Sequence, residues 1–187
     1  MNSTKGRVAQ KFKEIVCKKS FQKITISDIA KECDMTRENF YYHFHDKFDI
    51  IRWIIEVEVL NQLPETKDFL LWIDEMTESF QKDRQFYQRI FNELGKDAIR
   101  EQIAPVLEKR IRKIIELTSK DTVWSVRKEN KDFVISFISG AFVEMVFRSI
   151  QEKEIFNPEL FQQNLSFLTD HYLPFLRIEK EIEAGKE

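Results

Sequence analysis

The chain has 187 residues, a formal net charge of −2, and only four Gly and four Pro. A chain of this length can bury one or two small cores. So few turn-forming residues, together with many Lys, Glu, Leu and Ile, exclude the usual strand-rich classes. The sequence therefore predicts an all-α fold, with about nine helices from the apolar periodicity.

Several other classes are also disfavoured by the sequence. No apolar stretch opens the chain, so no signal peptide is expected, and the longest apolar-rich run, 133–147, contains Glu144 and is too short to cross a bilayer. Cys17 and Cys33 lack metal-ligand spacing and are predicted to be reduced core thiols. The lack of a signal peptide and of a membrane span predicts a cytoplasmic protein. Because no nucleophile elbow, phosphate-binding glycine loop or convincing carboxylate pair occurs, we expect no enzyme activity, cofactor or metal.

The charge is unevenly distributed along the chain. Residues 1–53 carry more Lys and Arg than Asp and Glu, whereas the remainder carries more acids than bases. A basic head on an acidic body is typical of a DNA-facing part joined to a part that does not touch DNA. Chance fluctuation is the alternative explanation of the charge difference taken alone.

The first predicted helix covers about 4–19, and a helix-turn-helix pattern follows at 25–47, which reads TISDIAKECDMTRENFYYHFHDK. Thr25, followed three residues later by an acid, predicts a capping box, with Ser27 as a competing cap. The first helix of the pattern should end near Asp34, a residue that tolerates the left-handed conformation of a tight turn.

The second helix of the pattern begins after Thr36, the predicted N-cap, with Asn39 at the third helical position. Met35 and Phe40 are spaced as a hydrophobic staple. Guanidinium, amide and hydroxyl groups follow within about two turns, and these groups bind base edges and phosphate oxygens. They belong to Arg37, Asn39, Tyr41, Tyr42 and His43.

This segment resembles the DNA-binding domain of the TetR family of bacterial regulators. The matching positions are Thr25, Ile26, Ile29, Ala30, Met35, Thr36, Phe40, Tyr41, His43, Phe44 and Lys47. Two positions depart from the family pattern: Asp34 stands where the family usually has Gly, and Glu38 stands where it often has Gly or Pro. The resemblance implies a DNA-binding transcription regulator with no enzyme activity, and it leaves the operator sequence open.

The resemblance also implies a role for each side chain. Base edges would be read by Arg37, Glu38 and Asn39, and phosphate or sugar would be bound by Tyr41, Tyr42, His43 and Lys47, with Thr25, Ser27 and Thr36 as further candidates at the helix starts. Three alternatives remain open: Tyr41 partly in the core, Lys47 as a cap of the next helix, and Glu38 as a solvated residue or a selector against certain bases.

A helix is predicted from 47 to about 63, before Pro64, and it is apolar on two sides. Such a helix must be covered on two sides, which suits a strut between two domains. The predicted organisation is a helix-turn-helix DNA-binding domain at 1–47 and a regulatory and dimerisation domain at 48–187.

Beyond Pro64 we expect helices at about 66–81, 84–94 and 97–118, a loop at 119–125, and helices at 130–151 and 158–173. Gly95 is a natural C-cap, and Pro105 is a possible bend. In the TetR family this part often binds a small molecule. The candidate pocket residues are Trp72, Phe80, Tyr87, Phe91, Phe137 and Glu144; an aromatic stripe that simply forms core, with Glu144 exposed at a helix edge, is the alternative.

The last two predicted helices are the candidate dimer surface, because in the family these helices pair with their copies. The small residues Ser136 and Gly140 permit close approach, and a second stripe comprises Phe161, Leu165, Leu168 and Tyr172. The alternative is that both helices are ordinary core. A homodimer would read two half-sites of a near-palindrome in double-stranded DNA.

The run Phe40-Tyr41-Tyr42, followed by Phe48, Ile51, Trp53 and Ile54, is similar to a branch of the family that contains activators of dihydroxyacetone-kinase operons. In that branch a partner protein can replace the small effector, so the effector is left open between a small molecule and a protein co-regulator. The rival hypothesis is a helical small-molecule-binding or protein-interaction module that has lost DNA binding. The two departures from the family pattern, at Asp34 and Glu38, would be the sign of that loss.

Overall fold

A computed structural model describes residues 3–63, 69–118, 128–151, 163–164 and 167 of the chain. These residues contain helices and no strand, which confirms the all-α prediction. In chain order the elements are α1 (Thr4–Val16), the 3₁₀ turn η1 (Phe21–Lys23), α2 (Ile26–Glu32), α3 (Arg37–His43), α4 (Lys47–Ile54), the π-helical segment η2 (Ile55–Leu60), α5 (Phe69–Lys82), α6 (Arg84–Thr118) and α7 (Lys128–Gln151).

The seven α-helices in the described part are fewer than the nine predicted for the whole chain. The helices predicted on either side of Gly95 form one kinked element, α6. The loop predicted at 119–125 and the helix predicted at 158–173 lie outside the described residues. Helix α7 begins two residues before the predicted start at 130.

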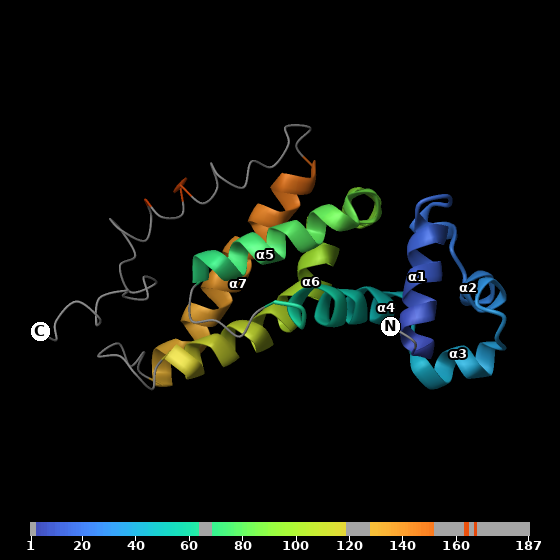
Figure 1. The fold of residues 1–187 in the computed structure, drawn as a ribbon, viewed down its shortest axis with the longest axis horizontal. Coiled ribbons are helices and arrows are strands. Elements are labelled where there is room, and N and C mark those ends of the chain that lie inside the picture. Colours follow the sequence, from blue (N-terminus) through green and yellow to red (C-terminus); the bar gives the residue numbers. More distant parts are fainter. Residues whose placement is uncertain (1–2, 64–68, 119–127, 152–162, 165–166, 168–187) are drawn as a thin grey trace, which may run out of the picture.

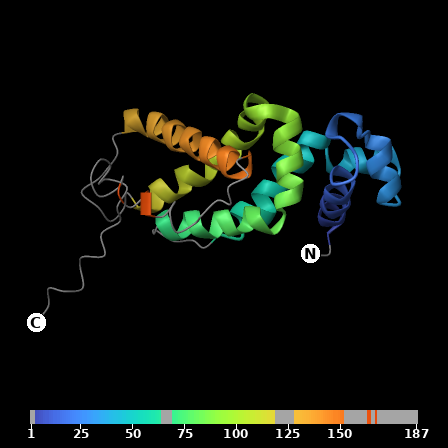
Figure 2. The same cartoon turned by 90° about the horizontal axis from the view of Figure 1, so that it is seen from above.

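The helices α1, α2 and α3 gather at one end of the molecule, and α4 leads from them to α5, α6 and α7 (Figure 1). We call the first three helices the head and the last three the body. Figure 2 shows α7 running alongside α6, and these two helices share the largest contact in the described part.

Helix α1 is shorter at its end than predicted. Ser3 caps its start by accepting a hydrogen bond from the Gly6 N–H at 3.1 Å. The helix stops at Val16 instead of Lys19. The Lys18 N–H bonds the Ile15 carbonyl, three residues back, at 2.9 Å, which is the tighter 3₁₀ pattern common at helix ends. The chain then enters η1, which the sequence pattern did not predict.

The start of α2 confirms the predicted capping box. The Asp28 N–H donates to Thr25 Oγ1 at 3.1 Å, and the Thr25 N–H donates to Asp28 Oδ2 at 2.8 Å. Two amide groups at the helix start are thereby satisfied inside the motif.

The turn between α2 and α3 has an aspartate in the left-handed region, with φ 51° at Asp34. The Asp34 N–H bonds the Lys31 carbonyl at 3.2 Å, and the Met35 N–H bonds the Ala30 carbonyl at 3.0 Å. This pair of bonds is the Schellman arrangement that usually ends in glycine. The predicted tight turn therefore forms, although Asp replaces the family glycine.

The strut, which consists of α4 and η2, changes from an α-helix to a π-helix halfway along its length. Asp46 caps α4 by accepting from the Asp49 N–H at 2.7 Å. In η2 the Asn61 N–H bonds the Glu56 carbonyl, five residues back, at 2.8 Å. The predicted continuous α-helix to 63 is therefore wrong. The wider π turn brings residues five apart onto one side, so the two ends of η2, Ile55 and Leu60, are both buried.

Gly95 divides α6 into two segments. Its backbone, at φ 75° and ψ 169°, lies in a region that only glycine adopts easily. The predicted helix end at Gly95 is confirmed, but the chain resumes a helix at once and continues through Pro105 to Thr118.

The buried apolar residues form one continuous cluster from head to body. The ring of Phe12 in α1 meets the edges of two other rings, Phe21 at 6.3 Å and Phe86 of α6 at 6.1 Å between centroids. Phe12 therefore joins the part of this cluster in the head to the part in the body. Within the described residues, no helix combines the length and apolar character that a membrane crossing needs.

Candidate nucleic-acid interface

Helix α3 has one buried face and one solvated face. Phe40 and the C-cap residue Phe44, four positions apart, are both fully buried. On the other side Tyr42 is 85% exposed and Tyr41 46% exposed. The residues of the first turn, Arg37, Glu38 and Asn39, are exposed as well. A short helix with this surface has the width that the major groove admits.

The cap of α3 forms as predicted, since Thr36 Oγ1 accepts from the Asn39 N–H at 3.2 Å. The carboxylate of Glu38 accepts from its own backbone N–H and from the Thr36 hydroxyl, and both bonds lower the pKa of Glu38. Glu38 is therefore an ionised acceptor at the exposed start of α3. Such a group can accept from a cytosine amino group and repels phosphate.

Arg37 lies one turn before Tyr41, and its guanidinium donates to the Tyr41 hydroxyl at 3.5 Å. This hydrogen bond raises the pKa of Arg37. The ring of Tyr42 meets the edge of the His43 ring at 5.1 Å between centroids. The structure thus brings the predicted base reader Arg37 and the predicted phosphate binder Tyr41 together on one side of α3.

At the start of α2 the predicted phosphate candidate Thr25 already uses its hydroxyl proton, which it donates to Asp28 Oδ2 at 2.8 Å. Lys19 bonds the same carboxylate at 2.8 Å, and the hydrogen bonds from Lys19 and Thr25 hold the pKa of Asp28 well below its usual range. A phosphate contact from the Thr25 hydroxyl would compete with this cap, whereas Ser27 is exposed and has its hydroxyl at the surface.

Lys47 is engaged inside the head. Its ammonium donates to the Phe21 carbonyl at 2.7 Å and to the Ile24 carbonyl at 3.2 Å, and it lies 4.2 Å from the centroid of the Phe21 ring. Partial burial lowers the pKa of Lys47. An ammonium has three N–H donors, so one remains for a phosphate.

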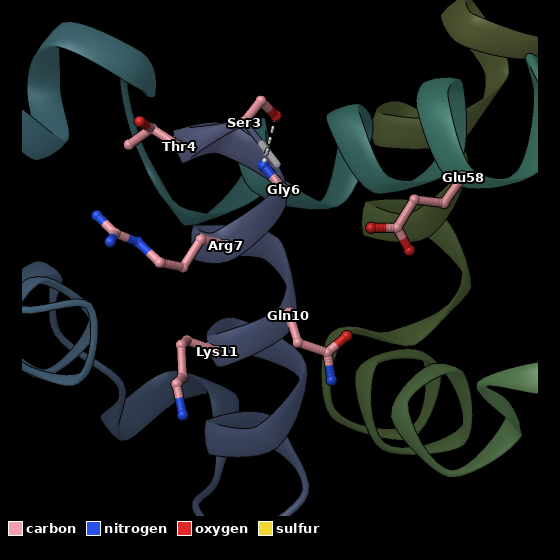
Figure 3. Close-up of a pocket in the computed structure, with 7 residues that line it drawn as sticks. All are labelled: Ser3, Thr4, Gly6, Arg7, Gln10, Lys11 and Glu58. Carbon is pink, nitrogen blue, oxygen red and sulfur yellow. Dashed lines mark hydrogen bonds between the residues drawn. The ribbon is translucent and has the colours of Figure 1, made fainter. Parts of the chain in front are cut away.

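The helix α1 adds cations that the motif does not include. Lys5 Nζ lies 5.2 Å from the centroid of the Phe44 ring, at the C-terminal end of α3. A groove of about 540 Å³ runs along the start of α1 (Figure 3) and is lined by Ser3, Thr4, Gly6, Arg7, Gln10, Lys11 and Glu58. Figure 3 shows Arg7 and Lys11 pointing away from Glu58, so the lining side chains do not converge on one ligand position.

Two comparisons with protein-family models show which family the chain belongs to. Residues 15–52 match "Bacterial regulatory proteins, tetR family", and residues 67–171, more than half of the chain, match "Transcriptional regulator C-terminal region". The chain belongs to the TetR family. The resemblance of the helix-turn-helix segment is thereby confirmed, and the matched families are transcription regulators, not enzymes.

Among individual TetR-family proteins, the chain is similar to the HTH-type dhaKLM operon transcriptional activator DhaS of Lactococcus lactis subsp. lactis (strain IL1403). They share 25% identity over 91 residues, which is 47% of this chain and 49% of that protein, so the match spans about half the length of the relative. A solved structure, "Dihydroxyacetone kinase operon activator DhaS", aligns with a TM-score of 0.64 and 19% identity over 89% of this chain and 94% of the other. The fold is shared along most of both chains.

The residues expected to line a TetR-type effector pocket do not all come together. Phe80, Tyr87 and Phe91 are buried and contact one another edge to face, at 4.7 Å and 6.1 Å between centroids. Phe137 is 57% exposed, and Glu144 lies on the surface in ion pairs. Phe137 and Glu144 therefore do not join these three rings, and their assignment to a pocket stays a prediction.

The buried face of α7 carries Ile135, Ile138 and Val143, which pack into the core. Glu144 points to the surface, where Lys96 and Arg148 bond its carboxylate and lower its pKa. The side chain of Trp72, the remaining candidate, is outside the described residues.

A small apolar void of about 10 Å³ lies in the core between α5, α6 and α7, next to Phe80 and Phe91. A small-molecule site needs a cavity of roughly 300 Å³ or more, and even one water molecule needs about 10–15 Å³. In the described part of this TetR-family body, the buried aromatic candidates are core.

The candidate dimer residues on α7 also contact their own chain. Ser136 donates to Glu108 of α6 at 3.3 Å, and an Arg100 nitrogen lies 3.5 Å from where a Cβ would stand on Gly140. Among the described side chains of α7, the large exposed apolar ones are Phe133 and Phe137, whose rings stack at 6.2 Å between centroids. The second predicted stripe, comprising Phe161, Leu165, Leu168 and Tyr172, lies outside the described residues.

Proposed function

We propose that this chain is a sequence-specific DNA-binding transcription regulator that inserts α3 into the major groove. The two-faced character of α3 is the observation that supports this proposal most directly. Phe40 and Phe44 anchor the helix in the head, while Arg37, Glu38 and Asn39 stand exposed at its start, where side chains reach base edges.

Two exposed tyrosines and two half-buried basic side chains fit contacts to the sugar-phosphate backbone. Tyr41, Tyr42 and His43 follow the base readers on α3, and Lys47 has one ammonium donor left. Ser27 and the start of α3 at Thr36 would bind phosphate as well, because exposed hydroxyls and helix amides are common phosphate ligands.

We further propose that the regulator binds as a homodimer. One head of this size covers a short stretch of duplex, and a two-fold pair reads a near-palindrome. The exposed rings of Phe133 and Phe137 on α7 support a partner copy on that face, since stacked exposed aromatics on a regulator body are costly in water.

Selection of bound fragments from random duplex DNA tests both proposals together. Recovered fragments should contain two inverted half-sites whose centres lie about 10 base pairs or a multiple apart. Failure to enrich any sequence, or binding that does not weaken with salt, would instead support the helical module that has lost DNA binding.

A protein co-regulator is a second candidate for the effector, and the size of the core void supports it. The void of about 10 Å³ beside Phe91 and Leu107 is itself too small for a metabolite. A Leu107→Phe variant fills this void. In a promoter-reporter assay the variant should keep its regulation if the effector acts at the surface, and should lose it if the effector enters the core.

A further inference from the structure

The turn η1 is attached to the body by one carboxylate. Glu93, on the first segment of α6, accepts two hydrogen bonds on Oε2, from the Ser20 hydroxyl at 2.6 Å and from the Phe21 N–H at 2.7 Å. Both bonds are short, as expected when the acceptor is ionised. The partners are more than 70 residues apart in the sequence.

The same turn is attached to the strut from its other side. The carbonyl of Phe21 accepts from Lys47, the first residue of α4, and the Ile24 carbonyl accepts from the same ammonium. The peptide groups of Phe21 are thus bound by Glu93 at the amide and by Lys47 at the carbonyl. The charge of Glu93 also acts on Lys47, since it favours the protonated ammonium.

The turn has no room to absorb a displacement. Phe21 is 2% exposed, and its ring meets the edges of Phe12 and Phe48 at 6.3 and 5.3 Å between centroids. Thr25, the N-cap of α2, follows this turn directly. A shift of Glu93 would therefore move the start of the helix-turn-helix, because η1 is too tightly packed to change shape on its own.

A second bond joins the same segment of α6 to the head. Arg89, one turn before Glu93, donates to the Val16 carbonyl at the end of α1, at 3.3 Å. Gly95, two residues after Glu93, is the break that separates this segment from the rest of α6. The segment before the break is bonded to the head, and both segments pack with α7, since Phe91 stacks on Phe147 and Glu108 accepts a hydrogen bond from Ser136.

We propose that Glu93 is a positioning residue for DNA binding, which sets the orientation of the helix-turn-helix from the body through η1 and Lys47. This inference rests on the proposed DNA-binding function. Glu93 contacts no DNA in this scheme. Its role is to fix the position of the Phe21 peptide. That peptide in turn fixes the position of Lys47, which bonds its carbonyl, and of the start of α2, which follows in the chain.

The test compares Glu93→Ala and Glu93→Gln with Glu101→Ala, which removes the same charge from an exposed position of α6. Affinity is measured for the selected operator and for random-sequence duplex. The Ala variant at 93 should lose about tenfold in operator affinity, as expected for one charge-assisted hydrogen bond, while its affinity for random duplex should match that of the control. The Gln variant, which keeps an acceptor oxygen, should lie between wild type and Ala.

Hydrogen exchange in the free protein gives a readout that does not need DNA. Loss of Glu93 should speed exchange of the Phe21 amide by about tenfold or more, and the increase should extend to the Asp28 and Asn39 amides at the starts of α2 and α3. Unchanged exchange at Phe21, or an increase confined to Phe21, would overturn the positioning role. Equal operator affinity of the Ala variant at 93 and the Glu101 control would also overturn it.

The two proposals fail in different ways. If the wild-type protein enriches no DNA sequence, the proposed function fails. The hydrogen-exchange data alone then test whether Glu93 fixes the position of the helix-turn-helix. If DNA binding is found and a Lys47→Gln, Glu93→Ala double variant loses the full sum of the two single losses, the residues act independently and the coupling through η1 is refuted.

Discussion

The ammonium group of Lys13 in α1 bonds the carboxylate of Asp83, the single residue that separates α5 from α6. The same ammonium bonds Glu58 in η2. Lys13 is only 6% exposed, so the head, the strut and the body meet around one buried cation. Burial disfavours its charge, but the hydrogen bonds to Asp83 and Glu58 outweigh that cost and raise the pKa of Lys13.

Replacing Lys13 with Met should destabilise the fold by about 2–4 kcal/mol, because two carboxylates would be left together without their cation. Urea unfolding measures the change. Lys18→Met, on the exposed end of the same region, is the matched control and should stay within about 0.5 kcal/mol of wild type. Equal values for the two variants would mean that the buried cation has no net effect on stability.

The pH dependence of this difference follows from the direction of the pKa shift. The pKa of Lys13 is raised above its ordinary value of 10.5, so its contribution is complete below pH 10.5 and is lost as the pH rises through the higher folded-state pKa. The difference in free energy of unfolding between wild type and Lys13→Met should therefore be constant through neutral pH and should decrease only in strong alkali.

The cap of α2 should show the opposite dependence. The pKa of Asp28 is lowered in the folded chain, so its contribution is present above the ordinary value of 3.8 and disappears as the pH falls towards the folded-state pKa. Thermal melts followed by circular dichroism should show Asp28→Ala less stable than wild type at pH 6. The difference should shrink steadily below pH 3.8, and a constant difference would contradict the carboxylate cap.

For DNA recognition, Arg37→Ala should cost about 1–3 kcal/mol of operator affinity and relax the preference at one base position. Binding to a set of single-base operator variants measures both effects. Equal loss on every variant would show that Arg37 binds the backbone and does not read a base.

Lys47→Gln should weaken binding to all sequences alike and reduce the slope of log affinity against log salt by about 1, if its free donor binds a phosphate. The structure adds a second expectation, because the same ammonium holds two carbonyls of the head. The variant should therefore also lower thermal stability. A stability loss with an unchanged salt slope would assign Lys47 to the head alone.

The two described glycines on the body make a matched pair. Gly95 has φ 75° with open space around a Cβ, whereas Gly140 has ordinary helical geometry with the nearest side-chain atom at 3.5 Å. Gly95→Ala should destabilise by about 1–3 kcal/mol through backbone strain. Gly140→Ala should be neutral or stabilise by up to about 1 kcal/mol through helix propensity. Urea unfolding of both variants decides whether strain at Gly95 is real.

The features that the sequence predicted correctly all depend on residues within about five positions of one another. The Thr25 and Asp28 cap, the left-handed Asp34, the Thr36 cap and the break at Gly95 follow from side-chain and backbone chemistry that acts inside one turn. The head was predictable for this reason, even with an aspartate in the place of the family glycine.

The features that only the tertiary structure decided involve partners distant in the chain. Lys13 meets Asp83, and Glu93 meets Phe21, across 70 and 72 residues, and a spacing rule of one turn carries no information on such pairs. The exposure of Phe137 was not predictable either, because aromatic periodicity does not tell which side of a helix the neighbouring helices cover. Local chemistry determined the caps of α2 and α3 and the turn between them, whereas long-range packing decided which charges are buried and how the head is joined to the body.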